Sequence, residues 1–205
     1  MAYSLRKTYQ NFHNEVTDLN KIIHALETRD ESLERDTHIE GCFIRFVVCW
    51  ESFVEEYFLR CLCSANTRTN KKIKPKEAPI KNINEAFKRI NKHRRSRDKD
   101  FLDWLDSKLI EQRISDFFRV NSRVQKICES PDKLYEVKII RNAIAHRSVS
   151  ALAKFEKMVK DQMGYLSTLE PTMASLLIQK RSNTNTLIFT IATDYFLGLA
   201  DRLTK

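Results

Sequence analysis

The sequence predicts an all-α fold, a helical bundle with a long antiparallel helical hairpin at its N-terminus. The 205 residues include only 3 glycines and 4 prolines, too few for the tight turns of an all-β fold or for a glycine-rich phosphate loop. Apolar residues make up 42% of the chain and recur with helical spacing over long stretches. The length suits one sizeable core, so we expect residues 1–205 to form a single domain.

Two long apolar stripes predict the helices of the hairpin. The first has the 3.5-residue spacing of a long helix, and the second, from about residue 36 to 65, repeats it. Additional apolar positions broaden the second stripe, so we expect this helix to be the most buried one. The two stripes consist of Leu5, Tyr9, Phe12, Val16, Leu19, Ile23 and Leu26, and of Ile39, Phe43, Phe46, Trp50, Phe53, Tyr57 and Cys61. Both stripes indicate a bundle core rather than a cofactor site.

The middle of the chain alternates between a loop and shorter helices. Two prolines interrupt residues 66–82, which we interpret as a basic loop. Apolar residues at helical spacing predict a helix at 83–90 and two more within 101–127. We expect the break between the last two near residues 119–122.

Capping signals define the helices of the C-terminal part. Ser130-Pro131 places a hydroxyl before a proline, which is typical of a helix start, and this helix runs to about His146. A further helix begins at Ser148 or Ser150. The segment 187–203 is predicted to be a helix, with a short strand as the alternative.

The positive charge of the chain is concentrated in one segment. The net charge is +9, and residues 66–99 alone carry thirteen Lys and Arg against three acids. Such a segment is typical of a surface that binds the phosphate backbone of a nucleic acid, and the alternative is a merely solvated loop. The candidate phosphate-binding residues of this segment are Lys71, Lys72, Lys74, Lys76, Arg94, Arg95 and Arg97.

The cysteines indicate neither disulfides nor a metal site. Their number is odd, and Cys42 and Cys49 share one helical stripe, which suits reduced thiols in a core. Cys61 and Cys63 have no nearby His or Cys partner, so we expect no metal and no cofactor. Residues 1–7 lack the apolar run of a signal peptide, and no stretch is long enough to span a membrane. We therefore expect a soluble, cytoplasmic protein without membrane contact.

The helix after residue 131 is apolar over most of its circumference, yet it holds Arg141, Asn142 and His146. An unpaired buried guanidinium costs several kcal/mol, so these residues must face a carboxylate or a wet cleft. Asn142 and His146 are four residues apart and share a face. Carboxylates of the second helix that could orient the arginine are Glu51, Glu55 and Glu56.

A histidine and an arginine at a wet cleft suit the cleavage of a phosphodiester bond. Histidine has an ordinary pKa near 6.5 and can take or give a proton, while a guanidinium stabilises charge on the phosphate. If the attacking group is the 2′-hydroxyl of the substrate, the protein needs no metal and no nucleophile, and the substrate is RNA. The alternative is a structural role, in which Arg141 and His146 only satisfy internal carboxylates.

The segment R-N-A-I-A-H at 141–146 resembles the R-x4-6-H signature of the HEPN superfamily, including the polar residue after the arginine. The segment C-W-E-S-F-V-E-E-Y at 49–57 is similar to the second helix of HEPN proteins of the RiboL-PSP type. The resemblance covers residues 5–165 and departs from many relatives at Arg147, where they have a small residue. It implies a bundle with the motif on a late helix, after a long hairpin.

The resemblance also implies a function. HEPN proteins of this kind are metal-independent endoribonucleases, usually homodimers whose two motifs form one composite site, and they serve as toxins or in defence against phage. It implies catalytic roles for Arg141, Asn142 and His146, and we add Arg147 as a further RNA contact beside them. An antitoxin or regulatory protein is the implied partner besides RNA. The alternatives are a non-catalytic module that binds RNA or a nucleotide in the same cleft, and an interaction scaffold.

Overall fold

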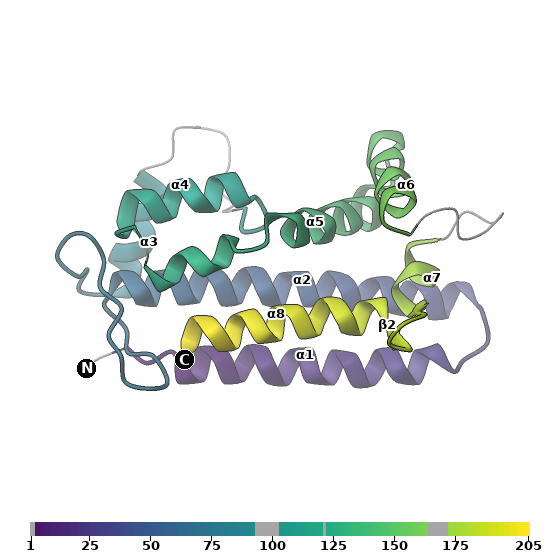
Figure 1. Ribbon diagram of the computed structural model, residues 1–205, viewed down its shortest axis with the longest axis horizontal. Coiled ribbons are helices and arrows are strands. Elements are labelled where there is room, and N and C mark those ends of the chain that lie inside the picture. The colour runs from purple at the N-terminus through teal and green to yellow at the C-terminus, as the bar shows by residue number, and fades with distance from the viewer. Residues whose placement is uncertain (1–2, 93–102, 121, 164–171) are drawn as a thin grey trace. The chain divides into compact units, whose positions relative to one another are not determined.

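The computed structural model describes residues 3–92, 103–120, 122–163 and 172–205, and in these ranges the fold is all-α apart from one two-stranded ribbon (Figure 1). This confirms the predicted fold class. None of the helices in the described ranges is both long and apolar enough to cross a membrane. The elements are α1 (Arg6–Glu27), α2 (Leu33–Leu62), α3 (Ile83–Lys92), α4 (Ser107–Phe117), the 3-10 helix η1 (Arg123–Cys128), α5 (Pro131–His146), α6 (Val149–Met163), α7 (Met173–Ile178), β1 (Lys180–Arg181), β2 (Thr186–Leu187) and α8 (Ile188–Thr204).

The chain divides into two compact units. Unit 1 comprises Met1–His13, Trp50–Pro131 and Leu197–Lys205, and unit 2 comprises Asn14–Cys49 and Asp132–Phe196. The helices α1, α2 and α8 each contribute one part to either unit. Unit 1 therefore holds the predicted basic loop, and unit 2 holds the helix with the candidate motif.

The predicted helical hairpin is present as α1 and α2. Every residue of the two predicted stripes is buried except Tyr9, which is partly exposed. The ring of Phe12 stacks on Phe53 at 5.0 Å in unit 1, and Arg45 forms an ion pair with Glu15 in unit 2. The 3.5-residue spacing thus predicted the buried side of both helices along their whole length.

The core of unit 1 is an aromatic cluster around Phe58 of α2. Its ring lies 5.3 Å from Trp104 and 5.2 Å from Phe118, between ring centroids. The basic loop is attached to this core by backbone hydrogen bonds, from Ile73 N to the Ala65 oxygen at 3.0 Å and from Lys76 N to the Phe117 oxygen at 2.8 Å. The loop is therefore held in place although it has no helix of its own.

The core of unit 2 joins α2 to the front of α8. Phe46 lies 6.2 Å from Phe189 and 5.5 Å from Phe196, between ring centroids. The side-chain oxygen of Asn20 on α1 accepts hydrogen bonds from the hydroxyls of Thr190 and Thr193, at 3.3 and 3.1 Å. These hydrogen bonds link α8 to α1 and give the hydroxyl of Thr193, which is fully buried, a partner on the other helix.

Two predictions for unit 1 were wrong in detail. The helix expected from residue 101 begins only at Ser107, because Asp103 and Asp106 cap turns: each carboxylate accepts backbone N–H groups that follow it. Leu109, expected on the buried stripe, is 43% exposed as a result. The second half of the segment is the 3-10 helix η1 rather than an α-helix. The break before it lies where it was predicted.

In the C-terminal part the predicted helices α6 and α8 are present, whereas α7 and strand β1 were not predicted. Among the two proposed serine caps, Ser148 accepts a hydrogen bond from Ala151 N at 3.3 Å at the start of α6. Thr172 caps α7 by accepting from Ser175 N at 3.0 Å. The last segment is a helix from Ile188, and the alternative of a strand is realised only in the two residues of β2 before it.

Candidate functional site

The candidate motif lies on α5, which begins at Pro131 and ends at His146 as predicted. Its apolar side is anchored in unit 2, and the next residue, Arg147, has a φ of 45°. This left-handed conformation ends the helix directly after the histidine. The buried residues of α5 are Leu134, Val137, Ile139, Ile140 and Ala143. These buried residues fix the orientation of α5, and His146 is among the residues left exposed to solvent.

Arg141 and Asn142 are held together at the edge of this buried surface. Both are partly buried, and the arginine Nη1 donates a hydrogen bond to the Asn142 side-chain oxygen at 2.9 Å. Among the residues described, Arg141 forms no ion pair. Its guanidinium therefore keeps donor groups available for an anion, oriented by a neutral amide rather than neutralised by a carboxylate.

His146 is exposed at the end of the same helix. Within the described part of the chain its ring makes no hydrogen bond. It follows Asn142 by four residues on one face, and it lies about 7.5 Å along the axis and about 140° around it from Arg141. The sequence predicted a largely buried helix, and Leu134, Val137, Ile139, Ile140 and Ala143 are indeed buried. The imidazole of His146, in contrast, is open to solvent and to a substrate.

Arg147 has a partner that sequence reasoning missed. Its Nη2 lies 2.7 Å from the carboxylate of Glu40 on α2, whose side chain is only 12% exposed. The pair ties the end of α5 to α2, and so fixes the backbone beside His146. One feature of the sequence could have indicated this partner: Glu40 is an acidic residue directly after Ile39, which belongs to the buried stripe of α2. The proposed RNA contact of Arg147 thus competes with an ion pair inside unit 2.

The three carboxylates proposed to orient Arg141 belong to unit 1, where Glu56 pairs with Arg60 at 2.7 Å. Glu51 is 8% exposed, and Glu55 accepts a hydrogen bond from Trp104 Nε1 at 3.1 Å. Glu55 therefore has a structural partner of its own in that unit. The residue that the structure places on Arg141 is Asn142.

Some basic residues of the segment in unit 1 are exposed without a partner among the described residues, and others have a hydrogen-bond or ion-pair partner. Lys71, Lys72 and Lys74 are exposed, and their ammonium groups have no partner among the described residues. Lys76 donates instead to the Ser115 carbonyl oxygen. Arg68 pairs with Asp201, and its guanidinium lies 4.0 Å from the ring centroid of Tyr9. Three further candidate contacts, Arg94, Arg95 and Arg97, lie outside the described residues.

The cysteines are unsuited to nucleophilic chemistry. All five are free, and burial raises the pKa of Cys49 and of Cys128 to about 12. Burial also raises the pKa of Cys42, Cys61 and Cys63. Because the thiolate is the reactive form, these raised pKa values disfavour nucleophilic attack by the cysteines. In the part of the chain that the structure covers, no three His, Cys, Asp or Glu side chains come together as a metal-ligand cluster.

Compared with known proteins, the chain matches no family model, no curated protein and no solved structure. Arg141 offers donors to a phosphate, Asn142 orients them, and His146 offers an imidazole that can accept or donate a proton. These three groups suffice for anion binding together with general acid–base catalysis.

Proposed function

We propose that the protein is a metal-independent endoribonuclease of the HEPN type, which cleaves RNA by attack of the 2′-hydroxyl on the adjacent phosphate. The observation that carries the proposal is the environment of the Arg141 side chain, its burial and its hydrogen-bond partner. Arg141 is partly buried on a helix that is otherwise anchored by apolar residues, yet within the described ranges its hydrogen-bond partner is an amide and not a carboxylate, and an exposed histidine ends the same helix. A purely structural arginine would be expected to face a carboxylate.

Each residue has one role in this proposal. The Arg141 guanidinium binds the scissile phosphate and stabilises the charge that develops on its oxygens. His146 removes the proton of the 2′-hydroxyl or protonates the leaving 5′-oxygen. Asn142 is a positioning residue, because its side-chain oxygen holds one guanidinium nitrogen and so aims the others. A toxin or defence role, with an antitoxin as partner, is the biological setting that the resemblance suggests.

Cleavage in the presence of a chelator tests the proposal. We expect the purified protein to cut single-stranded and structured RNA with excess EDTA present, because the attacking group belongs to the substrate and the acid and base belong to the protein. Cleavage is measured by gel electrophoresis of end-labelled RNA. Strict dependence on added magnesium or manganese would contradict the proposal. Tight RNA binding without any cleavage would favour the alternative, a non-catalytic binding module.

A homodimer is the second part of the proposal. Arg141 and His146 are about 140° apart on one helix, so a phosphate is contacted more easily by residues of two chains than of one. Large apolar side chains are exposed on both sides of the motif, with Tyr135 at 58% and Val149 at 88%. Tyr135 precedes His146 by eleven residues and shares its face to within about 20°. Exposed aromatic residues beside a polar site are typical of interfaces.

Mixing variants tests the composite site. We expect sedimentation at micromolar concentration to give twice the monomer mass, and Arg141→Ala and His146→Ala chains to be inactive alone. When the two are mixed, each heterodimer contains one intact Arg141 and one intact His146, on opposite chains, so part of the activity should return. Full activity from a protein that sediments as a monomer would contradict the shared site.

The basic segment is proposed to hold the RNA while the motif cuts it. Contacts to single-stranded phosphates contribute about −0.7 per neutralised charge to the slope of log K against log salt. Replacing Lys71, Lys72 and Lys74 together with glutamine should flatten the slope by roughly 0.7 to 2 units, measured by fluorescence anisotropy. Lys76→Gln is the matched control, because the Lys76 ammonium already donates a hydrogen bond to the Ser115 carbonyl oxygen.

Single-turnover cleavage by the triple variant at saturating RNA should stay near the wild-type rate. An unchanged slope in the triple variant would mean that this loop does not contact RNA.

A further inference from the structure

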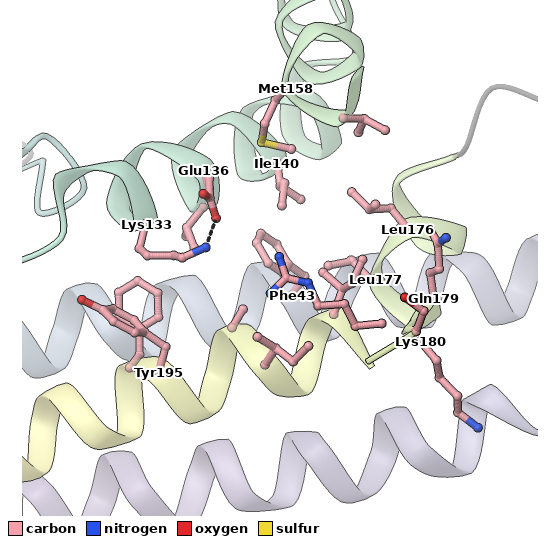
Figure 2. A pocket seen from close by; sticks show the side chains of 18 residues that line it. Phe43, Lys133, Glu136, Ile140, Met158, Leu176, Leu177, Gln179, Lys180 and Tyr195 are labelled. Carbon is pink, nitrogen blue, oxygen red and sulfur yellow. Dashed lines mark hydrogen bonds and ion pairs between the residues drawn. The ribbon is translucent and has the colours of Figure 1, made fainter. Parts of the chain in front are cut away.

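Unit 2 contains a cavity of about 460 Å³ that the proposed nuclease chemistry does not use. Side chains from α5, α6, α7, α8 and α2 line it (Figure 2). Figure 2 shows Ile140 and Met158 on one side, Leu176 and Leu177 on another, and Phe43 at its base. The α5 residues in the lining, Lys133, Glu136, Val137 and Ile140, are not residues of the motif, although Val137 precedes Arg141 by four residues and so lies on the same side of the helix.

The cavity is too large and too apolar to be a packing defect. Protein interiors have few voids larger than a water molecule, whereas this volume would hold about fifteen groups of water size at about 30 Å³ each. Most of its lining side chains are apolar, among them Phe43, Leu177 and Phe196. Water gains few hydrogen bonds at such a surface. The volume also falls in the range of about 300 to 1,000 Å³ that is usual for small-molecule sites. These properties indicate an apolar ligand.

The charged groups of the lining define the polar end of that ligand. Lys133 is paired with Glu136 at 2.8 Å, and Lys180 is paired with Glu27. Arg181, on the ribbon strand β1, is also in the lining, and its guanidinium has no ion-pair partner among the described residues. After the two ion pairs are subtracted, the lining keeps one positive charge. An anionic group on the ligand would complement it.

We propose that this cavity binds an amphipathic carboxylate of the fatty-acid class. Its hydrocarbon tail lies against Phe43, Ile140 and Leu177, and its carboxylate pairs with Arg181 at the mouth. About fifteen non-hydrogen atoms fit, which corresponds to a medium-length chain. The guanidinium can bind the carboxylate through two parallel hydrogen bonds, a geometry that a lysine does not offer. The inference is independent of the nuclease proposal, because none of its residues belongs to the motif.

Calorimetric titration of the whole protein tests the site with three probes. Decanoate has both tail and charge, 1-decanol has the tail alone, and acetate has the charge alone. We expect decanoate to bind once per chain, decanol to bind at least about tenfold more weakly, and acetate to give no measurable heat. Burial of the tail should make the heat-capacity change of decanoate binding negative. Failure of decanoate to bind below its micelle concentration would overturn the proposal.

Two variants separate the polar end of the site from its apolar end. Arg181→Gln should weaken decanoate about tenfold, the equivalent of one charge-assisted hydrogen bond, and leave decanol unchanged. The exposed Arg29→Gln in the same unit is the matched control and should change neither. Ala192→Phe fills the cavity and should abolish binding of both probes while the protein keeps its melting temperature. Undiminished decanoate binding in Arg181→Gln would contradict the headgroup assignment. Binding that survives Ala192→Phe in the folded protein would place the ligand elsewhere.

Discussion

Replacing either Arg141 or His146 with alanine is expected to reduce RNA cleavage by about 100- to 10,000-fold, the range typical of a lost general acid–base group or charge-stabilising donor. The fold should survive both changes. His146 is exposed, and Arg141 forms no ion pair among the described residues, so neither truncation leaves a charged partner buried. We expect the free energy of unfolding to change by no more than about 0.5 kcal/mol for His146→Ala, as for most surface substitutions. Single-turnover cleavage and thermal melting, measured on the same preparations, check both parts.

Matched controls distinguish the motif from a general loss of positive charge. Arg29 and His38 are exposed residues of unit 2, without side-chain partners among the described residues, and their alanine variants should cleave at the wild-type rate. Arg141→Lys keeps the charge but loses the forked donor geometry, so it should restore little activity. If Arg141→Ala or His146→Ala unfolds, or keeps full activity, the structural interpretation of that residue is correct instead.

The sequence was most informative where local chemistry determines the structure. The bounds of α5 follow from Ser130-Pro131 at its start and from the end of the apolar pattern at His146, and both signals lie within the helix or next to it. The buried stripes of α1 and α2 were equally predictable, because an apolar residue at every third or fourth position places these side chains on one side of a helix, and that side is buried. Periodicity was less reliable before α4. Trp104 and Leu105 are buried there by capped turns, which apolar spacing cannot distinguish from a helix.

The parts that depend on distant residues could not be predicted from the sequence. Arg147 and its partner Glu40 are 107 positions apart, and no local signal pairs them. The motif could be recognised because Arg141, Asn142 and His146 lie within six residues, but the exposure of the histidine depends on how α5 is buried. The cavity is built by residues from several separated elements, so nothing in any one segment indicates it.

Blocking the 2′-hydroxyl should abolish cleavage, and this is the second large effect that we expect. If the substrate supplies the nucleophile, an RNA that carries a 2′-O-methyl group at the scissile nucleotide has no attacking group. The cysteines are poor substitutes for it, because burial raises the pKa of their thiols and so disfavours the reactive thiolate. Binding should be little affected, since the phosphates that the basic segment is proposed to contact are unchanged. The modified RNA should therefore act as a competitive inhibitor of the unmodified one.

The most direct test of the account is the identity of the ends that the wild-type protein leaves on RNA in excess EDTA. Mass spectrometry of the products from a defined oligonucleotide should show 2′,3′-cyclic phosphate on the upstream fragment and a free 5′-hydroxyl on the downstream one. The matching oligonucleotide with a 2′-O-methyl group at the cleaved position should remain intact. Products with 5′-phosphate and 3′-hydroxyl ends, or cutting of the methylated oligonucleotide, would show that a nucleophile other than the 2′-hydroxyl attacks, and would contradict the proposed roles of Arg141 and His146.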